Sequence, residues 1–311
     1  MSILKRISFL LLAAVGCFSV SQAQDSIPVE DLSVIDDQLM VVPPLFEYVV
    51  APDELPDLVS RTDYIMDHFW DPFDFKNTSV VDQNALNHAF SVYAQAMAYA
   101  SEKKVDESVR NVIKKIKNNP GLSYQFAKAA EENLYGPRAE LWGDLVFIDF
   151  AQNLIDNKKI RESQKKHFKD VVDLLKNSAI GSPLPEFSAV NREGTEIKFR
   201  PSSNYTIICF TPSECPDGSY SDLKLDISAV VNDLLEDGEL EVDYIVLDGV
   251  DKNKSYPDKW NLYSSSDVGS KLDLRIAPSF FVIDRNKKIA GKNLTGDGAI
   301  SLIEILTGQA K

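Results

Sequence analysis

The first half of the chain, from 59 to 178, has the apolar spacing of amphipathic helices. In QNALNHAFSVYAQAMAYA, apolar residues recur every three or four positions and share one stripe. Similar patterns occupy the stretches 58–71, 105–119, 123–136, 138–155 and 162–179. We therefore expect about six helices with short loops, packed as an irregular bundle. Pro72 and Pro120 are expected to end two of these helices.

The pattern changes near Gly181 to the short apolar runs that are typical of strands. A Pro- and Gly-punctuated stretch with β-type alternation comes first, and continuous apolar runs that indicate buried strands follow. These predicted strands are 205–210, 240–251, 278–284 and 289–294, of which the last two form a hairpin. One amphipathic helix is expected over 219–238, a long loop over 252–270 and a closing helix over 297–308. This order predicts an α/β domain over 180–311.

The N-terminus has the pattern of an export signal. Lys5 and Arg6 precede an apolar run at 7–20, which is shorter than a membrane span, and Ser21-Gln22-Ala23 fits a cleavage site. We read 1–23 as a signal peptide. Alternatively, Ala14-Val15-Gly16-Cys17 resembles a lipobox, in which Cys17 would be lipidated. Both alternatives predict a protein of the periplasm or cell envelope.

The stretch 24–58 is rich in Asp, Glu and Pro and shows no sustained period, so we expect an irregular leader that follows the surface. The whole chain of 311 residues has a length that suits two domains. Its formal net charge is −14, and it contains no dense Lys/Arg cluster, which argues against nucleic-acid binding. No cofactor motif is visible, and membrane contact is expected only through a lipid on Cys17.

Four segments in the second half carry a family resemblance. They are GSPLPEF (181–187) with Gly194, FTPSEC (210–215), VLDGVD (246–251) and IAPSFFVID (276–284). In this order they resemble the thioredoxin-like superfamily, in its branch of exported TlpA-like and peroxiredoxin-like proteins. The resemblance implies an α/β thioredoxin-like C-terminal domain preceded by an all-α helical domain.

The resemblance also implies a thiol site, with one departure from the family. When the sequence is aligned with the C-x-x-C motif, Cys215 occupies the position of the first cysteine and Gly218 that of the second. The resolving cysteine is therefore lost. Pro278 takes the place of the family's cis-proline. Together with Ala277 and Pro216 it would shape a groove for a partner's extended strand.

Physical chemistry argues in both directions about Cys215. A helix N-terminus stabilises a thiolate, and Pro216 suits a first helical turn. The carboxylates of Glu214 and Asp217 oppose a second negative charge beside them. Cys209 lies within an apolar strand and is a poor resolving thiol, so we expect it to be a buried apolar residue.

The helical half carries a second resemblance, through WDPFDF (70–75), NLYGP (133–137) and the junction KNSAIGSPLPEF (176–187). These stretches are similar to exported proteins of uncharacterised function from Gram-negative bacteria. The resemblance implies an envelope location and assigns no activity to the helical half.

Other candidate residues point to no second chemistry. His68, His88 and His167 lie on separate predicted helices, so we expect no metal site. Asp248 and Asp251 lie near the C-terminal end of a predicted strand, where ligands often bind in α/β sheets, but acids are also common in loops. Aromatic residues at 69–75 are expected in the bundle core rather than as a sugar platform. Trp260 either lines a face near Cys215 or anchors its loop.

Two hypotheses follow for the function. In the first, the protein is an envelope thiol–disulfide oxidoreductase that uses Cys215 alone, through a mixed disulfide with a protein thiol or disulfide. In the second, the thioredoxin-like domain is a redox-inactive scaffold, and the helical domain over 59–178 binds a partner or ligand.

Overall fold

The computed structural model describes residues 43–137, 139–249 and 256–309. The chain divides into two compact units at Arg161. The expected signal peptide at 1–23, the leader as far as residue 42, and Asp251 lie outside the described residues. Cys17 lies outside them as well.

The first unit is helical, as the apolar spacing predicts. It contains α1 (Leu58–His68), α2 (Gln83–Met97), α3 (Glu102–Ile116), α4 (Pro120–Leu134) and α5 (Asp144–Asp156). Polar residues cap the helix starts: Asp57 accepts a hydrogen bond from the Ser60 N–H, and Asp82 accepts one from the Ala85 N–H. The apolar stripe of α2 is buried, as expected.

Aromatic side chains form the centre of this helical unit. Phe69 and Trp70 are 1% and 4% exposed, and the Trp70 ring lies 5.0 Å from that of Phe126, centroid to centroid. Phe46, from the described part of the leader, places its ring 5.5 Å from Trp70. The aromatic run that follows α1 therefore belongs to the core, which confirms that expectation.

Pro120 has a different role from the expected one. The helix α3 ends at Ile116, and Pro120 is the first residue of α4 rather than the stop of the helix before it. Asn119 caps α4, since its side-chain oxygen accepts a hydrogen bond from the Leu122 N–H at 3.1 Å. Proline is favoured at a first helical position because its missing N–H would have no intrahelical partner there.

The second unit begins with α6 (Glu162–Asn177) and continues into a mixed sheet. The sheet has seven strands in the order β2-β1-β5-β4-β3-β6-β7. Its strands are β1 (Ser188–Asn191), β2 (Glu196–Lys198), β3 (Tyr205–Thr211), β4 (Leu240–Val246), β5 (Asn261–Ser264), β6 (Ser279–Ile283) and β7 (Ile289–Leu294). The central strands β3 and β4 are parallel, and β6 pairs antiparallel with β3.

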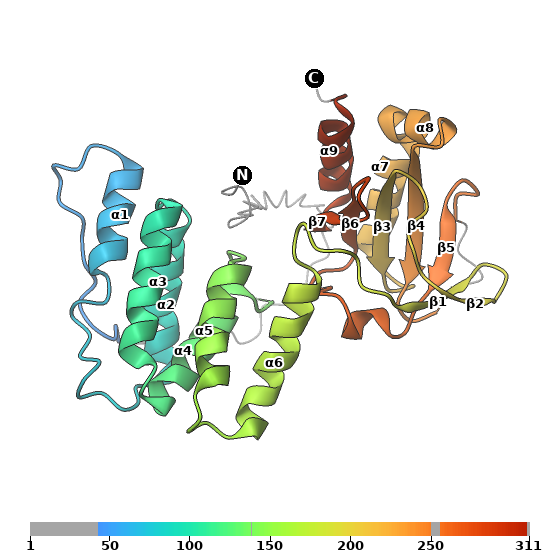
Figure 1. Cartoon of the computed structure of the whole chain (residues 1–311). Coiled ribbons are helices and arrows are strands. Elements are labelled where there is room, and N and C mark those ends of the chain that lie inside the picture. Colours follow the sequence, from blue (N-terminus) through green and yellow to red (C-terminus); the bar gives the residue numbers. More distant parts are fainter. Residues whose placement is uncertain (1–42, 138, 250–255, 310–311) are drawn as a thin grey trace, which may run out of the picture. The chain divides into compact units, whose positions relative to one another are not determined.

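Helices cover one face of this sheet (Figure 1). They are α7 (Pro216–Ile227), α8 (Ala229–Glu236) and α9 (Gly296–Thr307). Leu225, Val231 and Ile303 from these helices pack with the buried side chains of one sheet face. The opposite face packs against Phe187, Phe199 and the segment around Val268. An α/β domain behind an all-α region is the expected fold class, which is confirmed.

Two elements differ from the sequence-based expectation. The helix predicted over 219–238 is two helices, because Ser228 is not helical (φ −66°, ψ 118°) and caps α8. The stretch 252–270, expected to be a loop, contains β5 and a short 3₁₀ helix at Val268–Ser270. The four residues of β5 show too little alternation of apolar and polar positions to be recognised as a strand from sequence alone. They form a strand because they pair with β4 and β1.

Candidate functional site

The turn from β3 to α7 carries Cys215. The strand ends at Thr211, and Cys215 is the residue immediately before the first turn of α7, with extended backbone (φ −130°, ψ 105°). Pro216 is the first helical residue, as the sequence predicts. Cys215 as a whole residue is partly exposed. Cys215 thus lies at the N-terminus of α7, the end of the helix toward which the first backbone N–H groups point.

A carboxylate from the neighbouring strand holds this turn. Asp248 follows β4, and its two carboxylate oxygens accept from the Ser213 N–H (2.7 Å) and the Ser213 hydroxyl (3.1 Å). These hydrogen bonds lower the pKa of Asp248, the backbone one most. Because the bonds fix the residue two positions before Cys215, Asp248 orients the turn. The sequence marked it only as an acid at the end of a strand.

Pro278 lies at the same end of the sheet as Cys215. The bond between Ala277 and Pro278 is cis, as the family resemblance implies. Phe210 pairs with Ser279 in the antiparallel β3–β6 ladder, so one further step of this register brings Pro278 beside Thr211. Ala277 is exposed and Pro278 is partly exposed. The pairing of β3 with β6 thus brings Cys215 and the Ala277–Pro278 bond to the same end of the sheet.

The second position of the C-x-x-C pattern is Gly218, within α7. Cys209, the other described cysteine, is 1% exposed in the middle of β3, between Tyr244 and Phe280 on the neighbouring strands. Neither described cysteine is in a disulfide. Glu214 is exposed next to Cys215. Cys209 therefore lies within the core, as expected, and does not belong to the surface site.

Trp260 is part of the core behind α7. Its side chain is 3% exposed, and its ring stacks on Tyr244 with centroids 6.2 Å apart. The Tyr244 hydroxyl donates to Asp222 of α7 (3.0 Å), and burial raises the pKa of Tyr244. Of the two alternatives for Trp260, the structure supports the anchor of the loop, because this ring is buried rather than exposed near Cys215.

The histidines remain separate in the structure. His68 Nδ1 lies 2.8 Å from an Asp71 carboxylate oxygen, and His88 Nδ1 lies 2.6 Å from the Tyr48 hydroxyl. The ring of His167 contacts Phe168. Across the described residues, no three His, Cys, Asp or Glu side chains gather as metal ligands would.

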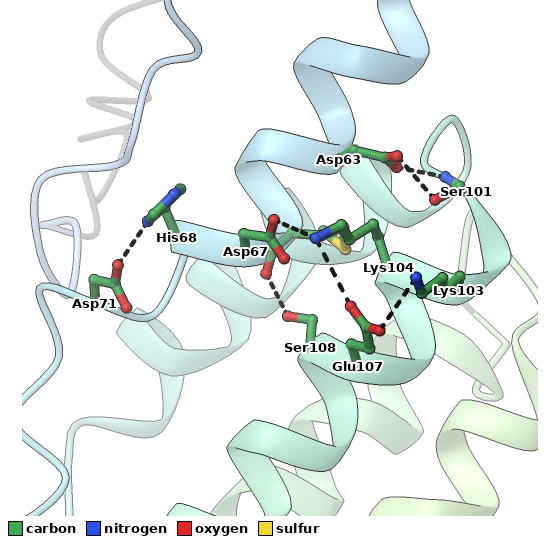
Figure 2. A network of polar contacts seen from close by, with 10 residues as sticks. Asp63, Asp67, His68, Asp71, Ser101, Lys103, Lys104, Glu107 and Ser108 are labelled. Atoms are coloured by element: carbon green, nitrogen blue, oxygen red, sulfur yellow. Dashed lines mark hydrogen bonds and ion pairs between the residues drawn. The ribbon is translucent and has the colours of Figure 1, made fainter.

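The helical unit contains a polar network, which Figure 2 shows between α1 and α3. Asp63 accepts from the Ser101 N–H (2.6 Å), and Lys104 Nζ lies 2.6 Å from Asp67. The Ser108 hydroxyl donates to the Met66 carbonyl (2.5 Å) and accepts from buried Tyr93 (2.8 Å). These contacts pair groups of adjacent helices, so the network holds α1 against α3.

A polar groove of about 700 Å³ lies along α3 and α5. Asp106, Arg110 and Asp156 line it together with side-chain amides. Two of these amides are engaged within the fold: Asn153 donates to Ser123 (3.2 Å) and Asn157 donates to the Lys117 carbonyl (3.1 Å). Mixed charges and engaged amides point to no particular ligand class.

Comparison with known proteins identifies the first half of the chain. The family model described as "Domain of unknown function (DUF5106)" matches residues 19–178, slightly more than half of the sequence. The chain belongs to the DUF5106 family. This DUF5106 region ends next to the junction between α6 and the sheet. No curated protein matches the chain.

Solved structures show the fold of the remainder. A thioredoxin-like protein from Bacteroides caccae superposes with a TM-score of 0.67 at 16% identity, covering 86% of this chain and 99% of that one. The C-terminal domain of an uncharacterized protein from Bacteroides fragilis matches at 17% identity, over 42% of this chain and 99% of that one, with a TM-score of 0.37. A thio-disulfide isomerase from Thermus thermophilus matches at 22% identity, over 42% of this chain and 96% of that one, with a TM-score of 0.32. The first of these matches shows that this DUF5106 protein has a thioredoxin-like C-terminal domain.

Proposed function

We propose that this protein catalyses thiol–disulfide exchange with Cys215 as its only reactive thiol. The observation that carries the proposal is the position of Cys215. It is partly exposed, lies directly before α7, and is at the same end of the sheet as Ala277–Pro278. A thiol needs access and a stabilised thiolate for this chemistry, and a helix N-terminus supplies the second.

The reaction has two steps that balance without a further oxidant. The Cys215 thiolate attacks one sulfur of a partner disulfide. A bond forms between Cys215 Sγ and that sulfur, and the other partner sulfur leaves with the bonding pair as a thiolate, which water protonates. A second thiolate, from a protein or a small thiol, then attacks the partner sulfur of the mixed disulfide and releases the Cys215 thiolate. The sum is a disulfide interchange.

The missing second cysteine determines which reactions are accessible. With Gly218 at that position and Cys209 in the core, no described thiol can expel the partner from Cys215. A lone thiol suits interchange or the formation of mixed disulfides, whereas a dithiol can also carry out net oxidation or reduction. The redox-inactive scaffold remains the alternative, favoured by Gly218 and by the acidic side chain of exposed Glu214.

We also propose that the exchange takes place outside the cytoplasm. The apolar segment at 7–20 and the cleavage-site pattern before Gln24 support export, and Cys17 offers the alternative of a lipid anchor. No helix in the described part of the chain is long and apolar enough to cross a membrane.

Trapping the mixed disulfide tests this function. The folded protein is mixed with a cysteine peptide whose thiol is joined to thionitrobenzoate, and intact mass is measured together with chromophore release. We expect a peptide adduct on Cys215 that a small thiol removes. Cys215→Ser should abolish the adduct, and the matched variant Cys209→Ala should keep it, because that thiol is buried. A wild-type protein that forms no adduct until it is unfolded supports the scaffold instead.

A further inference from the structure

The strand β2 forms one outer edge of the seven-stranded sheet, and among the described strands it pairs only with β1. On the side that faces β1, the Phe199 N–H donates to the Phe187 carbonyl, and the Asn191 N–H donates to the Thr195 carbonyl. Because backbone groups alternate in direction along a strand, Ile197 faces β1 in the same way as Thr195 and Phe199. The odd-numbered residues of this strand therefore complete its pairing with β1.

The even-numbered residues of β2, Glu196 and Lys198, direct their backbone N–H and C=O groups away from β1. In the part of the chain that the structure describes, no backbone or side-chain group is hydrogen-bonded to them on this outer side. Both residues are exposed. An edge strand with open backbone groups is a template on which a further strand can pair.

The charges along this edge are self-complementary. Two copies of β2 that run antiparallel about a two-fold axis at Ile197 place Glu196 of each copy opposite Lys198 of the other. Opposite charges across an antiparallel pair favour pairing, whereas like charges oppose it. A shift of the register by two residues in either direction places two lysines or two glutamates opposite each other at the axis. Charge therefore selects the register that is centred on Ile197.

Ile197 contributes an apolar contact in the same register. Its side chain is partly buried and packs against the core of that sheet face, which includes Phe187 and Ile208. At the axis, Ile197 meets its own counterpart in a non-hydrogen-bonded pair, the kind in which opposite side chains come closest. The pairing thus removes the remaining exposed apolar surface of this side chain from water.

Charged side chains on an edge strand often keep other chains away. The charges of β2 do this in the shifted registers, but they attract in the centred one. Lys198 Nζ also lies 3.7 Å from a carboxylate oxygen of Glu186 in the same chain, and the two side chains are 75% and 51% exposed. So exposed a pair contributes little, and Lys198 can therefore exchange it for a glutamate of a second copy.

We propose that β2 is a self-association surface, through which two copies of this chain pair edge to edge with Glu196 of one copy opposite Lys198 of the other. The contact uses the same patch on both copies, so it closes at two. The strand has three residues, and a contact of this size gives a weak dimer, with a dissociation constant in the micromolar range or above. The dimer does not depend on the chemistry of Cys215.

Charge reversal in the full chain tests the pairing. Lys198→Glu places glutamates opposite glutamates, and Glu196→Lys places lysines opposite lysines. For each variant alone we expect the dissociation constant of the dimer to rise roughly tenfold or more. An equimolar mixture of the two variants should form a heterodimer, because opposite charges meet again. Sedimentation velocity over a concentration series measures each sample, and circular dichroism checks that each variant is folded.

Lys103→Glu is the matched control for the change in net charge, since Lys103 lies on α3 and its side chain is 80% exposed. We expect this variant to dimerise as the wild type does. A wild-type protein that stays monomeric up to high micromolar concentrations would overturn the inference. So would a mixture of the two charge variants that dimerises no better than either variant alone.

A covalent cross-link tests the register independently of charge. Ile197→Cys is made on a background in which the three native cysteines are replaced. Directly opposite residues of a non-hydrogen-bonded pair have Cα atoms about 4.5 Å apart, within the span of a disulfide. We therefore expect mild oxidation to give a covalent dimer. Thr195→Cys is the control, because residue 195 lies opposite Phe199 of the other copy and far from its own counterpart. Equal cross-linking of the two variants, or none in Ile197→Cys, would overturn the proposed pairing.

Discussion

At the scale of single residues, two carboxylate residues of the second unit are bound to residues from distant parts of the chain. Asp248 binds Ser213, 35 positions before it, and Asp273 is bound through its N–H to Ser178, 95 positions before it. Cys215 and Pro278 could be placed from the sequence because each adjoins an apolar strand with a clear signal. The partners of the two carboxylates could not, because their contacts arise only when the sheet has assembled.

Asp243 is a buried acid that should make stability depend on pH. It is 2% exposed in β4, and Asn261 donates to it at 2.9 Å. Burial raises its pKa to about 8, with a further contribution from Glu241. The unfolded chain has a pKa of about 3.9 there, so the folded state holds the proton more tightly. The free energy of unfolding should then fall as pH rises between about 4 and 8.

Asp243→Asn should remove this dependence. We expect the variant to gain stability relative to wild type as pH rises from 5 to 7, by up to about 1.4 kcal/mol per pH unit. Urea unfolding at the two pH values measures the difference, with Asp258→Asn as the control, since that carboxylate is fully exposed. If the difference in the free energy of unfolding between Asp243→Asn and wild type is the same at both pH values, the raised pKa of Asp243 is contradicted.

At the scale of elements, apolar runs identified the strands that are buried on both faces. All seven residues of β3 and of β4 are buried, and both strands were predicted. The strand β5 was missed because its four residues form a strand through pairing with β4 and β1. Ser228 divides one expected helix into α7 and α8, and the continuous apolar pattern on either side concealed this break.

The start of α4 shows that a local sequence signal can determine where a helix begins. Asn119 accepts from the Leu122 N–H at 3.1 Å and donates to the Thr78 carbonyl at 2.9 Å. Asn119→Ala removes both bonds, and we expect the free energy of unfolding to fall by about 1–2 kcal/mol. Chemical denaturation followed by circular dichroism measures it. Asn119→Asp keeps the helix cap, so its free energy of unfolding should fall less than that of Asn119→Ala. Equal decreases in the two variants would show that the cap contributes nothing to stability.

At the scale of the whole molecule, a DUF5106 region precedes a thioredoxin-like domain. The change of pattern near Gly181 predicted both parts, because helical and strand periodicities differ. The family match ends at residue 178, whereas the compact units divide at Arg161 and place α6 with the sheet. Ser178, which follows α6, accepts a hydrogen bond from the N–H of Asp273, 95 positions further along the chain, and no local pattern reveals that contact.

Export makes a prediction about the mature chain. Mass spectrometry of the protein purified from a Gram-negative host should find an N-terminus at Gln24, or a lipid-modified N-terminal Cys17. Cys17→Ser distinguishes the two, since it should leave the first product unchanged and abolish the second. A mature protein that still begins at Met1 would contradict export.

The most direct test of the account is the alkylation rate of Cys215 at neutral pH, in the folded protein and in the unfolded chain, on a Cys209→Ala background. Only the thiolate reacts, so the ratio of the two rates reports whether the fold stabilises it. We predict that the folded protein reacts several-fold faster, by roughly the 0.3–1 kcal/mol or more that a helix N-terminus provides. A folded protein that reacts more slowly than the unfolded chain would contradict a nucleophilic Cys215 and leave the thioredoxin-like domain as a scaffold.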